Sequence, residues 1–302
     1  MCSIVFNPIY LLENKGLGNA LRVALENATN ELVARMDSDD ISLPRRFESQ
    51  LELFKKNGNI DIVGGDISEF VGEEQNITGI RTVQRANNQI RADMKRRCPM
   101  NHVSVMYKKS AVNKSGGYID FPFNEDYYLW IRMMQNGCIF ANTSDVVVNV
   151  RTGLDMAARR GGKTYFKSEK DIQAYMFKNG IISYPQYAYN VFIRFVAERL
   201  MPNSIRNRLF KFTRKENIEI NNNEVGKRLN GDMDRSEYPQ FSVAMSVYKN
   251  DNPEWFDKAI KSISIDQTIK PDEIVLVVDG PVPDSIHSVI DKYSKIFAGG
   301  GV

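Results

Sequence analysis

Apolar residues in the first third of the chain fall into short runs that alternate with amphipathic stretches. Runs at residues 7–12, 32–36 and 60–65 predict strands, and the stretches after Gly16 and Arg45 carry apolar residues at helical spacing. Strand, helix, strand, helix, strand is the order of βαβ units in a parallel sheet. This part of the chain therefore predicts an α/β fold.

The middle of the chain is less regular. Its patterns predict strands at 102–107, 138–141 and 146–150, and a helix at 126–136. From 170 to 215 the pattern is helical, with aromatic residues interleaved with Arg and Lys. A basic, aromatic-rich amphipathic segment can lie on an anionic membrane surface, and a helix packed on its own domain with a solvated basic face is equally compatible with the pattern.

The last part of the chain repeats the early pattern after a polar interruption. Residues 217–240 include three consecutive Asn residues, two Gly residues and one Pro, which is typical of a linker. Beyond it the patterns predict a strand at 241–248, a helix at 255–265, a strand at 273–278 and a helix at 285–297. This unit is too small a sheet to be stable alone, so it must join the rest of the chain.

Composition excludes several classes of function. The 302 residues are 42% apolar and 25% charged, as in an ordinary soluble globular protein, and 40 Lys and Arg against 37 Asp and Glu give a net charge of +3. That balance and the lack of a nucleic-acid-binding motif argue against nucleic acid as a partner. Three cysteines without metal-ligand spacing predict reduced thiols in the cytoplasm. Neither a signal peptide nor a membrane-spanning helix is predicted.

An acidic cluster, Asp37-Ser38-Asp39-Asp40, directly follows the apolar run 32–36. Open α/β sheets hold their ligands at the carboxyl ends of strands, and carboxylate oxygens suit a divalent cation that bridges phosphates. The cluster therefore predicts chemistry on a phosphate-bearing substrate. The alternative, which is favoured for Asp40, is that the cluster caps the helix that begins near Pro44.

Five segments together resemble the family 2 glycosyltransferases, which are inverting sugar transferases with the GT-A fold. They are residues 241–248, residues 273–280, residues 14–21 (Asn-Lys-Gly-Leu-Gly-Asn-Ala-Leu), the acidic cluster and residues 125–130 (Glu-Asp-Tyr-Tyr-Leu-Trp). In the family the first two precede the other three, whereas here they follow. The chain is therefore expected to be a circular permutant, or a fusion of two incomplete copies. If it closes as one sheet, the strand before the acidic cluster must lie beside strands from the far end of the chain.

The resemblance implies a mixed, mostly parallel sheet flanked by helices, with four parts along the chain. Residues 1–169 would form the main part of the GT-A catalytic domain, and 170–216 a helical, basic extension. Residues 217–240 would form the linker. Residues 241–302 would supply the first βαβ nucleotide-binding unit of the GT-A domain, in permuted position.

The resemblance also implies roles for the acidic residues. Asp37 is expected near the ribose and, with Asp39, as a ligand of Mg²⁺ or Mn²⁺ that neutralises the departing diphosphate. Asp126 matches the general base, and Glu125 is expected to orient the acceptor. The alternative is that Glu125 and Asp126 only supply acidic residues to the first turn of a helix, and the two interpretations are compatible.

The remaining candidates would bind the donor and acceptor. Asp279 matches the aspartate that accepts a hydrogen bond from uracil, with Ser246 and Tyr248 lining the same base pocket, although Asp-Gly after a strand is also a generic turn. Lys15 and Asn19 match positions that hold nucleoside or phosphate.

Three further candidates lie outside the matched segments. Arg159 and Arg160 could hold a diphosphate or lie in a solvated turn. His102 is expected in the acceptor site or the core. Some members of the family carry a histidine metal ligand at a position that falls within 145–151 here, and this chain has none there.

The expected activity is metal-dependent, inverting transfer of a sugar from a UDP-sugar to a saccharide acceptor. The subgroup with an Arg-Arg-Gly-Gly loop resembles bacterial enzymes that extend lipid-linked O-antigen or capsule oligosaccharides. A cytoplasmic location with peripheral contact at the inner face of the cell membrane would follow. The alternatives are a non-catalytic nucleotide-sugar-binding or segment-exchanged protein, and a nucleotidyltransferase, whose glycine-rich phosphate loop residues 249–253 do not supply. The donor sugar, the acceptor linkage and the oligomeric state stay open.

Overall fold

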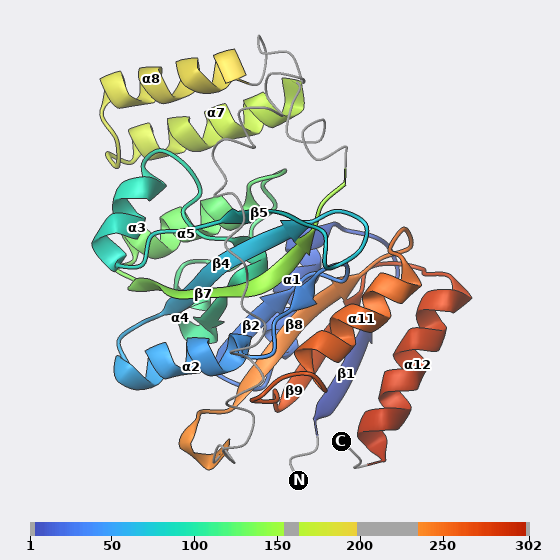
Figure 1. The fold of residues 1–302 in the computed structure, drawn as a ribbon. Helices are drawn as coiled ribbons and strands as arrows, with labels where there is room; N and C mark the ends of the chain where they lie inside the picture. Colours follow the sequence, from blue (N-terminus) through green and yellow to red (C-terminus); the bar gives the residue numbers. More distant parts are fainter. Residues whose placement is uncertain (1–3, 154–162, 198–234, 300–302) are drawn as a thin grey trace.

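The computed structural model describes residues 4–153, 163–197 and 235–299 (Figure 1). Within them one nine-stranded sheet has the order β1-β9-β8-β2-β6-β4-β7-β3, with β5 paired to β4. The strands are β1 (Val5–Tyr10), β2 (Leu32–Met36), β3 (Ile41–Ser42), β4 (Ile62–Phe70), β5 (Ile77–Arg81), β6 (Met106–Lys108), β7 (Phe140–Arg151), β8 (Phe241–Val247) and β9 (Glu273–Val278). Strands β1, β9, β8 and β2 are parallel, and β6 is antiparallel to β2 and β4. The sheet is therefore mixed and mostly parallel, as predicted.

Helices cover both faces of the sheet. Helices α2 (Arg46–Lys56), α11 (Pro253–Ile263) and α12 (Asp284–Ala298) share one apolar core with the sheet. On the other face lie α1 (Leu17–Asn27), α3 (Asn87–Met94), α4 (Lys109–Lys114) and α5 (Glu125–Gln135). Successive residues of β8 alternate between the two cores, with Val243 and Met245 in the first and Ala244 in the second. This architecture is the GT-A fold that the sequence predicts.

Two antiparallel helices, α7 (Lys163–Lys178) and α8 (Tyr184–Phe195), form a hairpin beyond α5, with α8 on the side away from the sheet (Figure 1). The chain turns between them at Gly180, whose φ of 68° suits glycine. The predicted helical stretch 170–215 is therefore broken, and α7 already begins at Lys163. Residues 198–216 and 217–234 of the predicted extension and linker lie outside the described residues. Among the described helices, none combines the length and apolarity needed to cross a bilayer.

Strands from the two ends of the chain pair directly. Leu32 to Met36 in β2 align with Phe241 to Met245 in β8, and β1 lines up with β9. The buried carboxylate of Glu273 in β9 accepts hydrogen bonds from Thr29 N at 2.9 Å and from Ser242 Oγ at 2.6 Å. Because a buried carboxylate is costly unless it is hydrogen-bonded, these bonds favour the closed sheet. The predicted adjacency is confirmed, while the permuted origin of the chain stays a prediction.

Two predicted strands differ from the structure. The predicted strand 102–107 begins with a 3₁₀ turn, η1 (His102–Ser104), and only Met106–Lys108 is extended. Ser104 Oγ donates to Asn101 O at 2.8 Å and accepts from Gly65 N at 3.1 Å, so a polar side chain satisfies the turn. The separate strands 138–141 and 146–150 are one strand, β7, whose pairing register shifts opposite residues 64–67 of β4.

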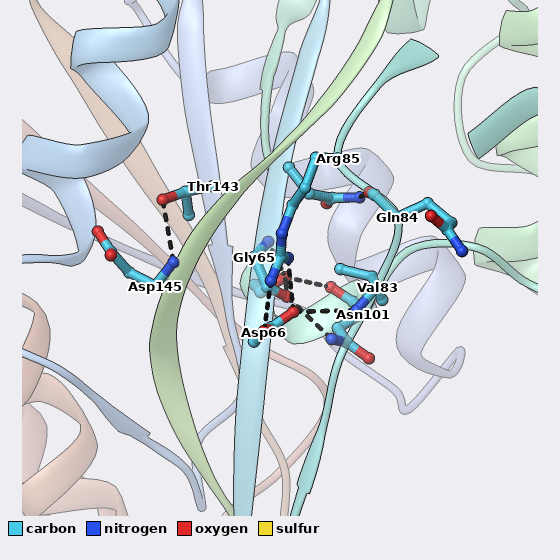
Figure 2. Close-up of polar contacts among 10 residues, drawn as sticks. Gly65, Asp66, Val83, Gln84, Arg85, Asn101, Thr143 and Asp145 are labelled. Atoms are coloured by element: carbon cyan, nitrogen blue, oxygen red, sulfur yellow. Dashed lines mark hydrogen bonds and ion pairs between the residues drawn. The ribbon is translucent and has the colours of Figure 1, made fainter. Parts of the chain in front are cut away.

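A buried polar cluster fixes the loops beside this irregular register (Figure 2). Asp66 in β4 is 4% exposed and accepts two hydrogen bonds of 2.6 Å from Arg85 and one of 2.9 Å from Val83 N. Asn101 Nδ2 donates to Gly65 O at 2.9 Å. The cluster holds the segment before His102 against β4, and so it positions one wall of the site described next.

Candidate active site

The acidic cluster lies where the carboxyl ends of β2 and β8 meet. Oxygen atoms of Asp37, Asp39 and Asp40 all lie within 4.8 Å of one another. Ser38 Oγ donates to Asp251 Oδ2 at 2.8 Å, and Tyr248 N donates to the same oxygen at 3.0 Å. Since Asp251 follows β8, the site combines loops that are more than 200 residues apart in sequence.

Two of the three cluster carboxylates have partners within the protein. Arg35, 2% exposed near the end of β2, donates to both oxygens of Asp37, one at 2.6 Å. Asp40 is 3% exposed and accepts from Arg151 N at 2.8 Å. Helix α2 instead begins after Arg45 without a side-chain cap, so the capping alternative for Asp40 is wrong. Asp40 ties the acidic loop to the end of β7.

The Asp39 carboxylate has no side-chain hydrogen bond or ion pair to another described residue. Burial, followed by the nearby charges of Asp37 and Asp251, raises its pKa to about 6. Burial and the same cluster raise the pKa of Asp40 well above its ordinary value. A bound cation stabilises the ionised form of carboxylates that lie this close together, because it offsets the repulsion between them. Three hard oxygen donors within reach of one another fit Mg²⁺ or Mn²⁺, with Asp39 the least committed ligand.

Glu125 and Asp126 form the first turn of α5 and face different neighbours. Cys98 Sγ lies 3.6 Å from Asp126 Oδ2, whereas a Cβ on Gly18 would lie 3.8 Å from Glu125 Cβ. Burial and the adjacent Asp126 raise the pKa of Glu125 to about 7, and burial also raises the pKa of Asp126. The pair supplies acidic residues to the first turn of α5, as the structural interpretation expects, and the catalytic role stays a prediction.

His102 adjoins this carboxylate pair. One of its ring nitrogens lies within 4.8 Å of oxygen atoms of Glu125 and Asp126, and Nε2 is 3.0 Å from Tyr118 Oη. Burial, then the charge of Arg35, lowers the pKa of His102 well below its ordinary value. The lowered pKa favours the neutral imidazole, which forms a polar wall beside the two carboxylates.

Asp279 anchors the loop that carries Lys15 to the end of β9. Its carboxylate, 5% exposed, accepts from Lys15 N at 2.9 Å and from Gly16 N at 3.1 Å. The next residue, Gly280, has φ +86° and leaves no room for a side chain, because a Cβ there would lie 2.7 Å from Asn14 N. Sequence reasoning did not predict this anchoring role.

Replacing Gly280 with Ala is expected to disturb this loop. Positive φ and the clash with backbone together should lower the free energy of unfolding by about 2 kcal/mol. Nucleotide affinity should fall with it, since the loop carries Lys15 and leads to Asn19. Urea denaturation and calorimetric titration with UDP measure the two effects. Gly137→Ala is the matched control: it shares a positive φ of 81° but meets nothing within 4 Å, so only stability should change.

The other predicted residues occupy different positions around the strand ends. Lys15 Nζ is exposed and lies 3.2 Å from Glu13, and Asn19 Oδ1 accepts from Arg22 at 2.9 Å. Tyr248 is 39% exposed just after β8. Ser246 alternates with Val247 in β8, so it faces the α1 side of the sheet. Arg159 and Arg160 lie outside the described residues.

Sequence reasoning missed Arg35, Arg151 and Asp251. The Arg151 guanidinium lies 4.3 Å from the Trp255 ring and 4.6 Å from that of Phe70, and Nε donates to Asp39 O at 3.2 Å. A charged residue inside an otherwise apolar strand could have revealed Arg35, because such residues are rarely buried without a partner. Arg151 and Asp251 carry no comparable signal.

The fold is that of the GT-A class of glycosyltransferases, and carboxylates stand at its strand ends. Residues 5–115 match the family described as "Glycosyl transferase family 2". A relative from Haemophilus influenzae, an uncharacterized glycosyltransferase, is 37% identical over 208 residues, which cover 68% of this chain and 77% of the relative. The chain belongs to the family 2 glycosyltransferases, which confirms the resemblance and the prediction of an enzyme.

The names of two further relatives state the sugar that is transferred or the product that is made. The Escherichia coli UDP-Gal:alpha-D-GlcNAc-diphosphoundecaprenol beta-1,3-galactosyltransferase is 36% identical over 201 residues, covering 67% of this chain and 72% of that protein. The amylovoran biosynthesis glycosyltransferase AmsE of Erwinia amylovora is 36% identical over 210 residues, covering 68% of this chain and 76% of AmsE. Family membership favours sugar transfer over the nucleotidyltransferase alternative.

Proposed function

We propose that this enzyme transfers a sugar from a UDP-sugar, with inversion, to a lipid-linked saccharide acceptor in bacterial surface polysaccharide synthesis. The observation that carries the proposal is the meeting of the acidic cluster, the Glu125–Asp126 pair and the Asp279-anchored loop around one set of strand ends. The galactosyltransferase relative and a second one named for UDP-Glc support the UDP-sugar, and the GlcNAc-diphosphoundecaprenol in both names supports the acceptor.

In the proposed reaction Asp126 is the general base. It accepts the proton of an acceptor hydroxyl while that oxygen bonds to the anomeric carbon, and the bond from this carbon to the diphosphate breaks on the opposite face. Cys98 and His102 are the neighbours of Asp126, and the acceptor is assigned to their side of the site. Glu125 faces Gly18 and orients the two substrates where they meet.

Asp37 and Asp39 would hold Mg²⁺ or Mn²⁺, which when bound supplies the positive charge that stabilises a departing diphosphate. The Arg35 ion pair fixes Asp37, and the contacts of Arg151 with Asp40 and Asp39 O fix the loop that carries Asp39. The protein thereby presents the Asp39 carboxylate in a preset position, which avoids reorganisation during the reaction.

Donor recognition is proposed for the residues at the ends of β8 and β9. Ser246, Tyr248 and Asp279 would contact the base, and the exposed Lys15 and the half-buried Asn19 would contact nucleoside or phosphate. Arg159 and Arg160 would add cations for the diphosphate.

The proposal also covers the setting of the enzyme and the organisation of its chain. We place the enzyme at the cytoplasmic face of the cell membrane, in peripheral contact with it. The four-part division and the permuted order at 241–302 belong to the same proposal. The β2–β8 pairing supports the permuted order, whether the sheet closes within one chain or between two.

The decisive experiment is a donor screen. Purified enzyme is incubated with a panel of UDP- and GDP-sugars, Mn²⁺ and a GlcNAc-diphosphate carrying a short alkyl chain, and nucleoside diphosphate release is measured. We expect UDP release that EDTA abolishes and Mn²⁺ restores, and a product whose anomeric configuration, determined by NMR, is inverted. Release that is insensitive to EDTA, release from GDP-sugars alone or a retained configuration would contradict the corresponding part of the proposal.

A further inference from the structure

Helix α8 turns its apolar side chains outward. Tyr189, Phe192 and Ile193 are 64%, 61% and 45% exposed, and their spacing places them on one face of the helix. The residue that α8 buries is polar: Asn190 Nδ2 donates to Gln173 Oε1 at 2.8 Å. Arg194, next on the inner face, pairs with Glu169 at 2.5 Å. This is the reverse of an ordinary surface helix, which buries its apolar stripe.

Exposed apolar side chains stand along α8 and at the end of α7. We call this group the α8 face, and it consists of Phe177, Tyr184, Tyr189, Phe192, Ile193 and Phe195. The Phe177 and Tyr184 rings lie 5.8 Å apart, which joins the two helices at one end. Large apolar side chains exposed together on one element mark a site that another surface covers.

Cations outnumber acidic residues on the helical hairpin that carries the α8 face. Residues 163–197 contain five Lys and Arg against two acidic residues. On the inner side of α8, Asn190 Nδ2 also donates to Lys95 O at 2.9 Å and Arg194 donates to Arg96 O at 2.5 Å, so the exposed segment Lys95-Arg96-Arg97 lies beside the hairpin. An exposed apolar face on a hairpin with excess cations complements an anionic lipid surface.

The same segment leads directly to the carboxylate pair. Cys98 follows Arg97, and its Sγ lies 3.6 Å from Asp126 Oδ2. Helix α8 therefore lies, through residues 95–97, beside the Asp126 side of the site, to which the acceptor is assigned.

We propose that the α8 face is a docking surface for an anionic phospholipid bilayer, and that docking brings the Asp126 side of the site to acceptors held in that bilayer. The second half of this statement rests on the proposed lipid-linked acceptor, and the first half does not. A second copy of the chain is a poorer occupant, because a two-fold interface through this face would bring the same cations together. Anionic headgroups pair with them instead.

Vesicle co-sedimentation of the full chain tests the docking. Vesicles of phosphatidylglycerol and phosphatidylethanolamine should sediment the unmodified enzyme, and phosphatidylcholine vesicles should bind it far less. Combining Tyr189→Ser, Phe192→Ser and Ile193→Ser should weaken binding by at least about tenfold, since the apolar contact is lost. Lys95→Gln with Arg96→Gln should weaken it more at low salt than at high salt. The matched control combines Val5→Ser and Tyr10→Ser on the edge strand β1, where both side chains are more than half exposed, and should bind normally.

The following outcomes of the vesicle experiment would contradict the proposal. Failure of the unmodified enzyme to bind anionic vesicles, or equal binding by the triple variant, would overturn it. A triple variant that changes from dimer to monomer in light scattering, with no vesicle binding by the parent, would assign the face to a second copy. Transfer to the short-chain acceptor is measured on the same samples and should be unchanged in the triple variant. Vesicle binding needs neither donor nor acceptor, so failure of docking and failure of the proposed reaction are read separately.

Discussion

Asp126→Asn is expected to slow sugar transfer by about 10²–10⁴-fold, the usual contribution of a general base. The amide keeps the shape of the carboxylate but cannot accept the proton of the acceptor hydroxyl. The loss should appear in kcat at saturating donor and acceptor, whereas UDP affinity, measured by calorimetry, should be unchanged. An Asp126→Asn enzyme that works at the full rate contradicts the assignment.

Glu125→Gln is the matched comparison. Glu125 faces Gly18 rather than Cys98, so Glu125→Gln should slow sugar transfer less than Asp126→Asn does. A larger loss in Glu125→Gln would reassign the base to Glu125, whose pKa of about 7 also suits proton acceptance near neutral pH.

The stability of the Asp126→Asn variant separates lost chemistry from a lost fold. Burial raises the pKa of Asp126 in the folded state, so the folded protein favours the protonated carboxyl. The stabilisation is present below the unfolded pKa and is lost as the pH rises through the folded value. Asn never ionises, so the variant should melt at the same or a higher temperature than the parent at pH 8, with the difference shrinking toward acidic pH.

The sequence predicted the elements whose pattern is local. Strands β2, β8 and β9 are short, mostly apolar runs, of which β2 and β9 are followed by Asp, and their helices carry regular apolar stripes, so their existence and order could be predicted from spacing. The pairing of β2 with β8 followed from the resemblance, since no local pattern states which strands are neighbours. The 3₁₀ turn at His102 was missed because its cause, the bonds between Ser104 and Gly65, joins residues 39 apart.

The residues of the candidate site also divide into those that a local pattern predicts and those that it does not. Carboxylates that end strands, such as Asp39 and Asp279, stand out in sequence, and the structure places both at the same set of strand ends. The groups that fix these carboxylates come from other parts of the chain. Arg151 reaches Asp40 from the far end of β7, and Asp251 reaches Ser38 from the loop after β8. These partners depend on which strands pair in the fold, and the sequence alone does not show that pairing.

Comparison of Asp39→Asn with Asp37→Asn separates a metal ligand from a structural carboxylate. Asp39→Asn removes a charge that Asp37 and Asp251 repel, so the free energy of unfolding should be unchanged or higher. Mn²⁺-dependent transfer should nevertheless fall by about 10²-fold or more, because the least committed oxygen ligand is lost. Rates over a Mn²⁺ titration, with guanidinium denaturation of the same samples, measure both quantities.

Asp37→Asn should lose transfer and stability together. Arg35 is buried and depends on Asp37 for its charge partner, so the variant should lose about 2–3 kcal/mol of unfolding free energy. The contrast between the two variants is the test, because both remove one charge from the same four-residue cluster. If Asp39→Asn keeps the Mn²⁺ response, the metal lies elsewhere; if both variants are equally unstable, the cluster serves the fold rather than the reaction.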